Sequence, residues 1–78
     1  MSYSEEITKR FVKAYYALYG LQKVKSKKKF CDAIGSRSTH FILMEKGERR
    51  ATVENIALLV EKFDVSPEWL LTGKGNLY

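Results

Sequence analysis

The chain has little of several residue types that would point to particular kinds of protein. Its 78 residues include one cysteine, one proline and one histidine. One cysteine cannot form an internal disulfide, and a cysteine-ligated zinc site would need more. No apolar run approaches the roughly 18 residues of a membrane-spanning helix. The first six residues are polar and acidic, unlike a secretory signal peptide. We therefore expect a cytoplasmic protein without structural metal, disulfide or membrane contact.

Patterns associated with catalysis are also missing. No nucleophile has a base at a recognisable spacing, no carboxylate pair suggests a cleft, and no glycine-rich phosphate loop is present. Cys31 and His40 lie nine residues apart, which does not make a dyad without a cavity. The sequence therefore predicts a protein that is not an enzyme and uses no cofactor.

What is present is the composition of one globular domain with an uneven charge. Hydrophobic residues make up 45% and charged residues 29%, which suits a single domain over residues 1–78. The net charge is +5, but residues 23–50 carry nine Lys and Arg against three Asp and Glu. A basic middle of this kind favours contact with a polyanion, and a merely solvated lysine cluster is the alternative.

Apolar residues recur at helical spacing, and no segment alternates as a strand would. The clearest case is Ile56, Leu59, Val60 and Phe63. The pattern predicts an all-α fold whose helices share one core. The first expected helix runs from about Ser4 to Tyr19, with Ser2 or Ser4 as its N-cap and a left-handed Gly20 at its end. Two short helices follow, one from the cap Ser26 to Gly35 and one from Arg37 or Ser38 to Glu45. The last two expected helices run from the cap Thr52 to Phe63 and from the cap Ser66 to Gly73.

The basic middle of the chain coincides with two of these helices. Residues 26–45 hold two short helices joined by Gly35, Ser36 and Arg37. A glycine in a short turn between two helices is typical of the helix-turn-helix, since the turn requires a positive φ. In that motif the second helix enters the DNA major groove while the first crosses the phosphate backbone.

The stretch SKKKFCDAIGSRSTHFILMEKG resembles the helix-turn-helix of the lambda-repressor-like family, which includes Cro and the XRE regulators. The matching positions are the small Cys31, the turn glycine Gly35, the apolar Phe41 and Met44, and the pair Glu45 and Gly47. The segment VSPEWLLTGKG is similar to the family's closing helix, so the resemblance covers about residues 4–75.

The resemblance implies a five-helix lambda-repressor-like domain that binds double-stranded DNA sequence-specifically. Its function would be regulation of transcription, by repression, with the helix at about 38–45 in the major groove. It also implies a homodimer on a palindromic operator, in contact through residues 67–78, where Leu77 and Tyr78 stand at an apolar chain end. Whether the chain is a whole regulator or the head of a longer repressor stays open.

The resemblance also assigns residues to DNA. The expected base-reading residues are Ser38, Thr39, His40 and Leu43. The expected phosphate-binding residues are Lys27 (where the family usually has Gln), Lys28, Arg37, Lys46, Arg49 and Arg50. Ser38 or Thr39 could instead simply cap the helix. Glu45 is expected to hold the turn between helices, and Cys31 and Trp69 are expected in the core.

Ile42 and Leu43 depart from the family pattern, because they stand where polar side chains usually point at bases. Three explanations are open: contact with thymine methyl groups, contact with a partner protein, or a wider core. A partner protein would make the chain an antitoxin-like interaction module. A second alternative is a sequence-indifferent nucleic-acid binder driven by lysines 23–29.

Overall fold

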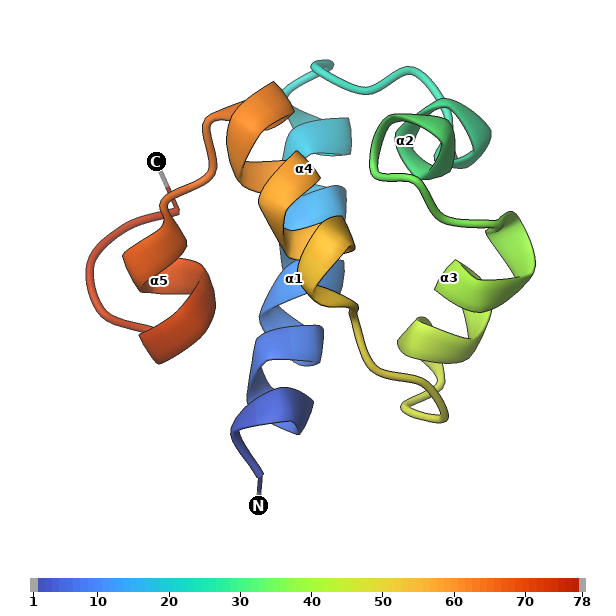
Figure 1. The fold of residues 1–78 in the computed structure, drawn as a ribbon. Coiled ribbons are helices and arrows are strands. Elements are labelled where there is room, and N and C mark those ends of the chain that lie inside the picture. Colours follow the sequence, from blue (N-terminus) through green and yellow to red (C-terminus); the bar gives the residue numbers. More distant parts are fainter. Residues whose placement is uncertain (1, 78) are drawn as a thin grey trace.

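The structure, a computed structural model that describes residues 2–77, contains five α-helices and, within those residues, no strand (Figure 1). The prediction of an all-helical fold is therefore confirmed. The helices are α1 (Tyr3–Gly20), α2 (Lys27–Ala33), α3 (Ser38–Glu45), α4 (Val53–Phe63) and α5 (Pro67–Thr72). In Figure 1, α1 and α4 occupy the middle, with α2 and α3 to one side and α5 to the other. Within the same residues no helix has the length and apolar character to cross a bilayer.

Side-chain caps begin four of the five helices. The hydroxyls of Ser2, Ser26, Thr52 and Ser66 each accept a hydrogen bond from the backbone N–H three residues later. α3 is the exception, because its N-cap is Arg37, whose side chain makes no capping bond. The interpretation of Ser38 or Thr39 as simple caps is therefore wrong.

The end of α1 also differs from expectation. The helix continues through Gly20, and Gln22 takes the left-handed conformation instead, with φ 60°. The N–H of Lys23 closes the helix on the carbonyl of Leu18 at 2.9 Å. Leu18 and Val24 are both buried, so the chain must turn between them. Core packing thus outweighs the roughly 1–2 kcal/mol that a left-handed residue other than glycine costs.

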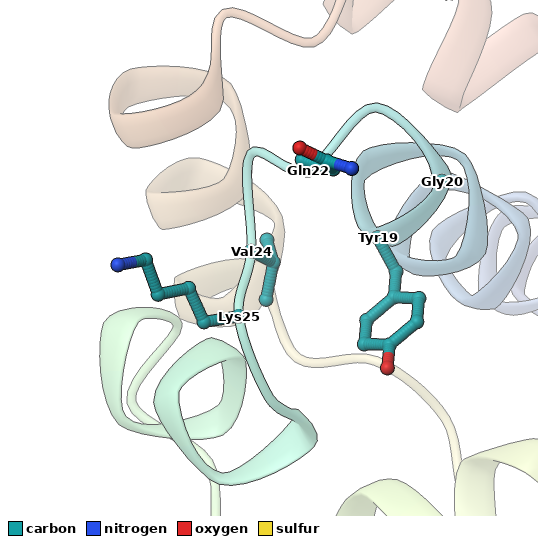
Figure 2. Close-up of a pocket in the computed structure, with 5 residues that line it drawn as sticks. All are labelled: Tyr19, Gly20, Gln22, Val24 and Lys25. Carbon is teal, nitrogen blue, oxygen red and sulfur yellow. The ribbon is translucent and has the colours of Figure 1, made fainter.

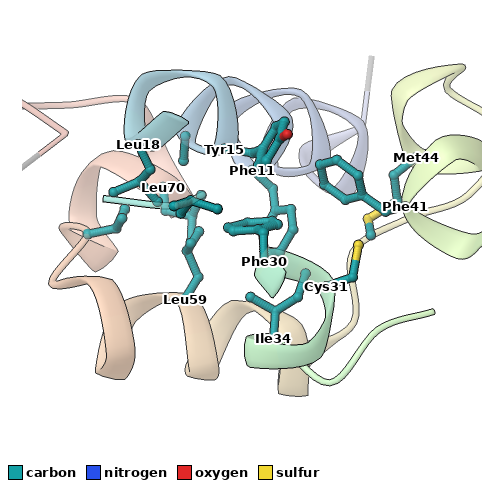
Figure 3. Packing of buried hydrophobic residues seen from close by; sticks show 13 residues of the cluster. Phe11, Tyr15, Leu18, Phe30, Cys31, Ile34, Phe41, Met44, Leu59 and Leu70 are labelled. Carbon is teal, nitrogen blue, oxygen red and sulfur yellow. The ribbon is translucent and has the colours of Figure 1, made fainter. Parts of the chain in front are cut away.

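A cluster of aromatic rings forms the centre of the core (Figure 3). Phe11, Phe30 and Phe41 come from α1, α2 and α3 and are fully buried. The ring of Phe30 lies 6.0 Å from that of Phe11 and 5.4 Å from that of Phe41, between centroids. Cys31 is buried as predicted, whereas Trp69 is only half-buried against the core. These contacts fix α2 and α3 on α1.

Two buried polar side chains, which the sequence pattern did not predict, tie loops to this core. Thr8 donates to the carbonyl of Ser4 at 2.8 Å and accepts from the N–H of Ala51 at 3.0 Å. The amide of Asn55 donates to the carbonyl of Ile34 at 2.9 Å. Asn55 therefore connects the start of α4 to the end of α2, where the turn toward α3 begins.

The C-terminal segment folds back on its own domain. The carbonyl of Leu77 accepts from the N–H of Ser66 at 2.7 Å, and the Leu77 side chain is half-buried against the core. Leu77 is therefore not the exposed apolar end that the sequence suggested, because its own domain covers it. Leu71 on α5 is exposed. Tyr78, the other residue expected there, lies outside the described residues.

Candidate nucleic-acid interface

The turn between α2 and α3 has the conformation that the sequence predicted. Gly35 has φ +70°, and the N–H of Ser36 bonds the carbonyl of Cys31 at 2.9 Å. A Cβ atom at Gly35 would lie 3.3 Å from Cδ1 of Leu58, so space as well as φ favours glycine. This hydrogen bond and the one from the Asn55 amide fix where α3 begins.

α3 has one buried side and one outward side. Phe41 and Met44 face the core. Thr39, Ile42 and Leu43 are spaced three and four residues apart, which places them together on the outward side. Thr39 and Ile42 are exposed, and Leu43 is half-buried.

Five of the predicted site residues line one shallow depression of about 420 Å³. They are Arg37, Thr39, His40, Leu43 and Arg49. Three were predicted to read bases and two to bind phosphate, so α3 and the loop after it bring both groups together. Nδ1 of His40 lies 3.5 Å from Oγ of Ser36, which orients the imidazole toward the turn.

The other predicted residues lie apart from this depression. Ser38 is exposed at the first residue of α3. Burial raises the pKa of the Cys31 thiol, and the Ser38 hydroxyl partly opposes that rise. Lys28 is exposed on the first turn of α2, and Lys46 is exposed at the end of α3. Arg50 is directed back to the protein, where it forms an ion pair with Glu5 at 3.3 Å and donates to the carbonyl of Gly47 at 3.2 Å.

Lys27 is part of a polar cluster that the sequence did not predict. Its Nζ donates to Oε1 of Glu45 at 2.8 Å, and the hydroxyl of Tyr16 donates to Oε2 of the same carboxylate. Glu45 therefore links α3 to both α1 and α2, rather than holding the turn between helices as expected. The Lys27 side chain stays 38% exposed, and its ammonium lies 5.9 Å from the Phe41 ring centre.

The electrostatics of this cluster follow from its hydrogen bonds. Burial on its own would raise the pKa of Glu45, but hydrogen bonds from Lys27 and Tyr16 and the Lys27 charge hold that pKa below its ordinary value. The hydrogen bond that Lys27 donates to Glu45 raises the pKa of the Lys27 ammonium. The hydrogen bond that Tyr16 donates to the same carboxylate raises the pKa of the Tyr16 phenol. At neutral pH the cluster therefore contains a stable carboxylate and a stable ammonium.

A second depression, of about 530 Å³, lies at the connection between α1 and α2 (Figure 2). Tyr19, Gly20, Gln22, Val24 and Lys25 line it. Lys25 is its one charged side chain and belongs to the lysine-rich segment 23–29. None of the predicted base-reading residues lies here, so the depression on α3 is the candidate site for specific contacts.

Comparison with known proteins supplies no independent assignment. No family model matches the chain, and neither the curated proteins nor the solved structures include a significant match. The fold and the site define a small all-helical domain with a basic depression on one short exposed helix.

Proposed function

We propose that the chain is a helix-turn-helix DNA-binding domain with the five-helix lambda-repressor-like architecture. In this proposal α3 enters the major groove of double-stranded DNA, and the domain regulates transcription as a repressor. The observation that carries the proposal is the depression on α3. It combines the guanidinium groups of Arg37 and Arg49 with Thr39, His40 and Leu43 on the same surface.

The two kinds of residue in the depression match the two tasks of a DNA-binding surface. Guanidinium groups bind phosphate oxygens and set the position of a protein on the duplex. Side chains near the start of a recognition helix contact base edges, and these contacts select the sequence. Lys28 on the first turn of α2 and Lys46 at the end of α3 are also exposed and add positive charge.

The proposal includes a dimer, because one such domain covers only part of a helical turn of DNA. Two domains on half-sites about ten base pairs apart would give useful affinity. α5 remains the proposed contact, since Leu71 on it is exposed. Arg10 fixes α5 on α1 by donating to the carbonyls of Leu70 at 2.8 Å and Leu71 at 3.1 Å.

The experiment is selection of duplexes from a random pool by the purified protein near physiological salt. We expect a palindrome with half-sites about ten base pairs apart. Binding of random duplexes without enrichment would instead support a sequence-indifferent binder. No binding to any duplex would refute the proposal.

An antitoxin-like interaction module is the second candidate. The exposure of Ile42 on α3 favours it, because exposed apolar side chains also serve protein contacts. A polar residue at position 42 would then abolish partner binding and spare any binding to DNA.

A further inference from the structure

α3 is apolar on both of its sides, although its fold requires only one apolar side. Phe41 and Met44 join it to the core. On the outward side Ile42 is 43% exposed, and Leu43 lines the depression. A helix needs a single apolar stripe to pack on its domain, so the folding of α3 does not explain this second stripe.

The surroundings of the outward stripe are cationic and polar. Leu43 shares its depression with the guanidinium groups of Arg37 and Arg49. Lys46 follows Ile42 by four residues, which places the two on the same side of the helix axis. An apolar strip within a positive surface fits a partner that is negatively charged overall and presents small apolar groups.

Double-stranded DNA is such a partner. Its major groove presents hydrogen-bonding edges at every base pair but only one apolar group, the C5 methyl of thymine. Neither isoleucine nor leucine has a polar side-chain atom, so neither can form a hydrogen bond with a base edge. The methyl group is therefore the feature of DNA that these two side chains can recognise.

We propose that Ile42 and Leu43 select thymine by burying its C5 methyl group, with Thr39 and His40 left to form the polar contacts. The proposal rests on the proposed function, and it specifies that function by assigning part of the sequence preference to apolar contacts. It predicts at least one thymine in each half-site whose methyl group contributes to affinity.

The test replaces thymine by uracil in the selected duplex, one position at a time. This substitution keeps base pairing and removes only the methyl group. We expect affinity to fall about fourfold for each methyl group that a side chain buries. Ile42→Ala and Leu43→Ala should each abolish this thymine-to-uracil ratio at one position and keep it at others.

Leu71→Ala is the matched control. Leu71 is 42% exposed, close to the 43% of Ile42, but it lies on α5, which Figure 1 shows on the opposite side of the domain from α3. Whatever this variant does to overall affinity, it should leave every thymine-to-uracil ratio unchanged. Ile42→Ala changes an exposed side chain, so it provides a folded test variant even if Leu43→Ala unfolds.

Different outcomes refute the two proposals. If no duplex binds, the proposed function fails and this inference fails with it. If a selected duplex binds tightly but uracil substitutes for every thymine without loss, only the inference is overturned. The inference is also overturned if the ratio persists in the Ile42 and Leu43 variants, or if Ile42→Ala removes binding of a protein partner and leaves the ratio unchanged.

Discussion

Removal of the Asn55 amide should destabilise the domain more than its position at the first turn of a helix suggests. Asn55 is 2% exposed and donates to the carbonyl of Ile34 at 2.9 Å, while its Oδ1 accepts from the N–H of Thr52 at 3.1 Å. Asn55→Ala removes both bonds: loss of the Thr52 bond costs about 1 kcal/mol, and leaving the buried Ile34 carbonyl without this partner costs about 1–3 kcal/mol. We expect a loss of about 2–4 kcal/mol. A domain of this size has a total stability of about 4–12 kcal/mol.

Urea denaturation followed by circular dichroism measures this loss. The midpoint should fall while the denaturant slope stays constant, because the surface exposed on unfolding is nearly the same. Thr52→Ala is the control, since it removes a cap of the same helix and should cost only about 1 kcal/mol.

Asn55→Asp isolates the bond to Ile34. Aspartate retains an acceptor for the Thr52 N–H and suits the first turn of a helix, but it has no N–H to donate. We expect a loss as large as that of Asn55→Ala at neutral pH, because the cost of burying a carboxylate against the Ile34 carbonyl oxygen offsets the retained Thr52 bond. If Asn55→Asp is as stable as the original chain, the proposed role of this amide in fixing the α2–α3 turn is refuted.

Four further predictions concern the turn and the site. Gly35→Ala should lower stability by about 1–2 kcal/mol, because alanine resists φ +70°; an unchanged urea midpoint would contradict this. Because the pKa of Glu45 is depressed in the folded state, its carboxylate contributes stability that is present above the ordinary glutamate pKa and is lost as pH falls through the folded pKa. Acidification from about pH 7 to about pH 3 should therefore destabilise the original chain more than the Glu45→Gln variant. Equal losses of stability for the two proteins in urea titrations would refute this linkage. Arg37→Ala should reduce the salt slope of DNA binding by about one. Lys27→Ala should reduce it by less, because Lys27 is already paired with Glu45. Equal slopes for the two variants in salt titrations would show that the Lys27–Glu45 pair does not persist on DNA. Thr39→Ala should change the preferred sequence by about 1–3 kcal/mol at one base pair, and a selection that returns the original sequence would remove Thr39 from the base-reading set.

The helix starts were predictable from the sequence because their causes are local. Ser26, Thr52 and Ser66 cap the helices that they were expected to cap, since each hydroxyl bonds an N–H only three residues away. The end of α1 was not predictable in this way. Whether Gly20 or Gln22 takes the left-handed conformation depends on the burial of Leu18 and Val24, which is a property of the whole core.

The candidate site was predictable only in part, for the same reason. Helical spacing predicted that Phe41 and Met44 face inward, and the outward position of Thr39 and Leu43 follows from it. The pairing of Lys27 with Glu45 joins residues 18 positions apart, which no local pattern reveals. The Asn55 amide had one local signal, its capping-box spacing from Thr52, but nothing in the sequence showed that its other end would reach Ile34.

The sequence by itself determined the five helices, the side-chain caps that begin four of them and the glycine turn, because these depend on bonds within a few residues. It also determined the basic character of residues 23–50. The tertiary structure decided which of those charges face outward. It directed Arg50 toward Glu5 and Lys27 toward Glu45, and it placed Arg37 and Arg49 around one depression on α3. The physical reason is that an ion pair depends on distance in space, and packing of α1, α2 and α3 on one aromatic core sets those distances.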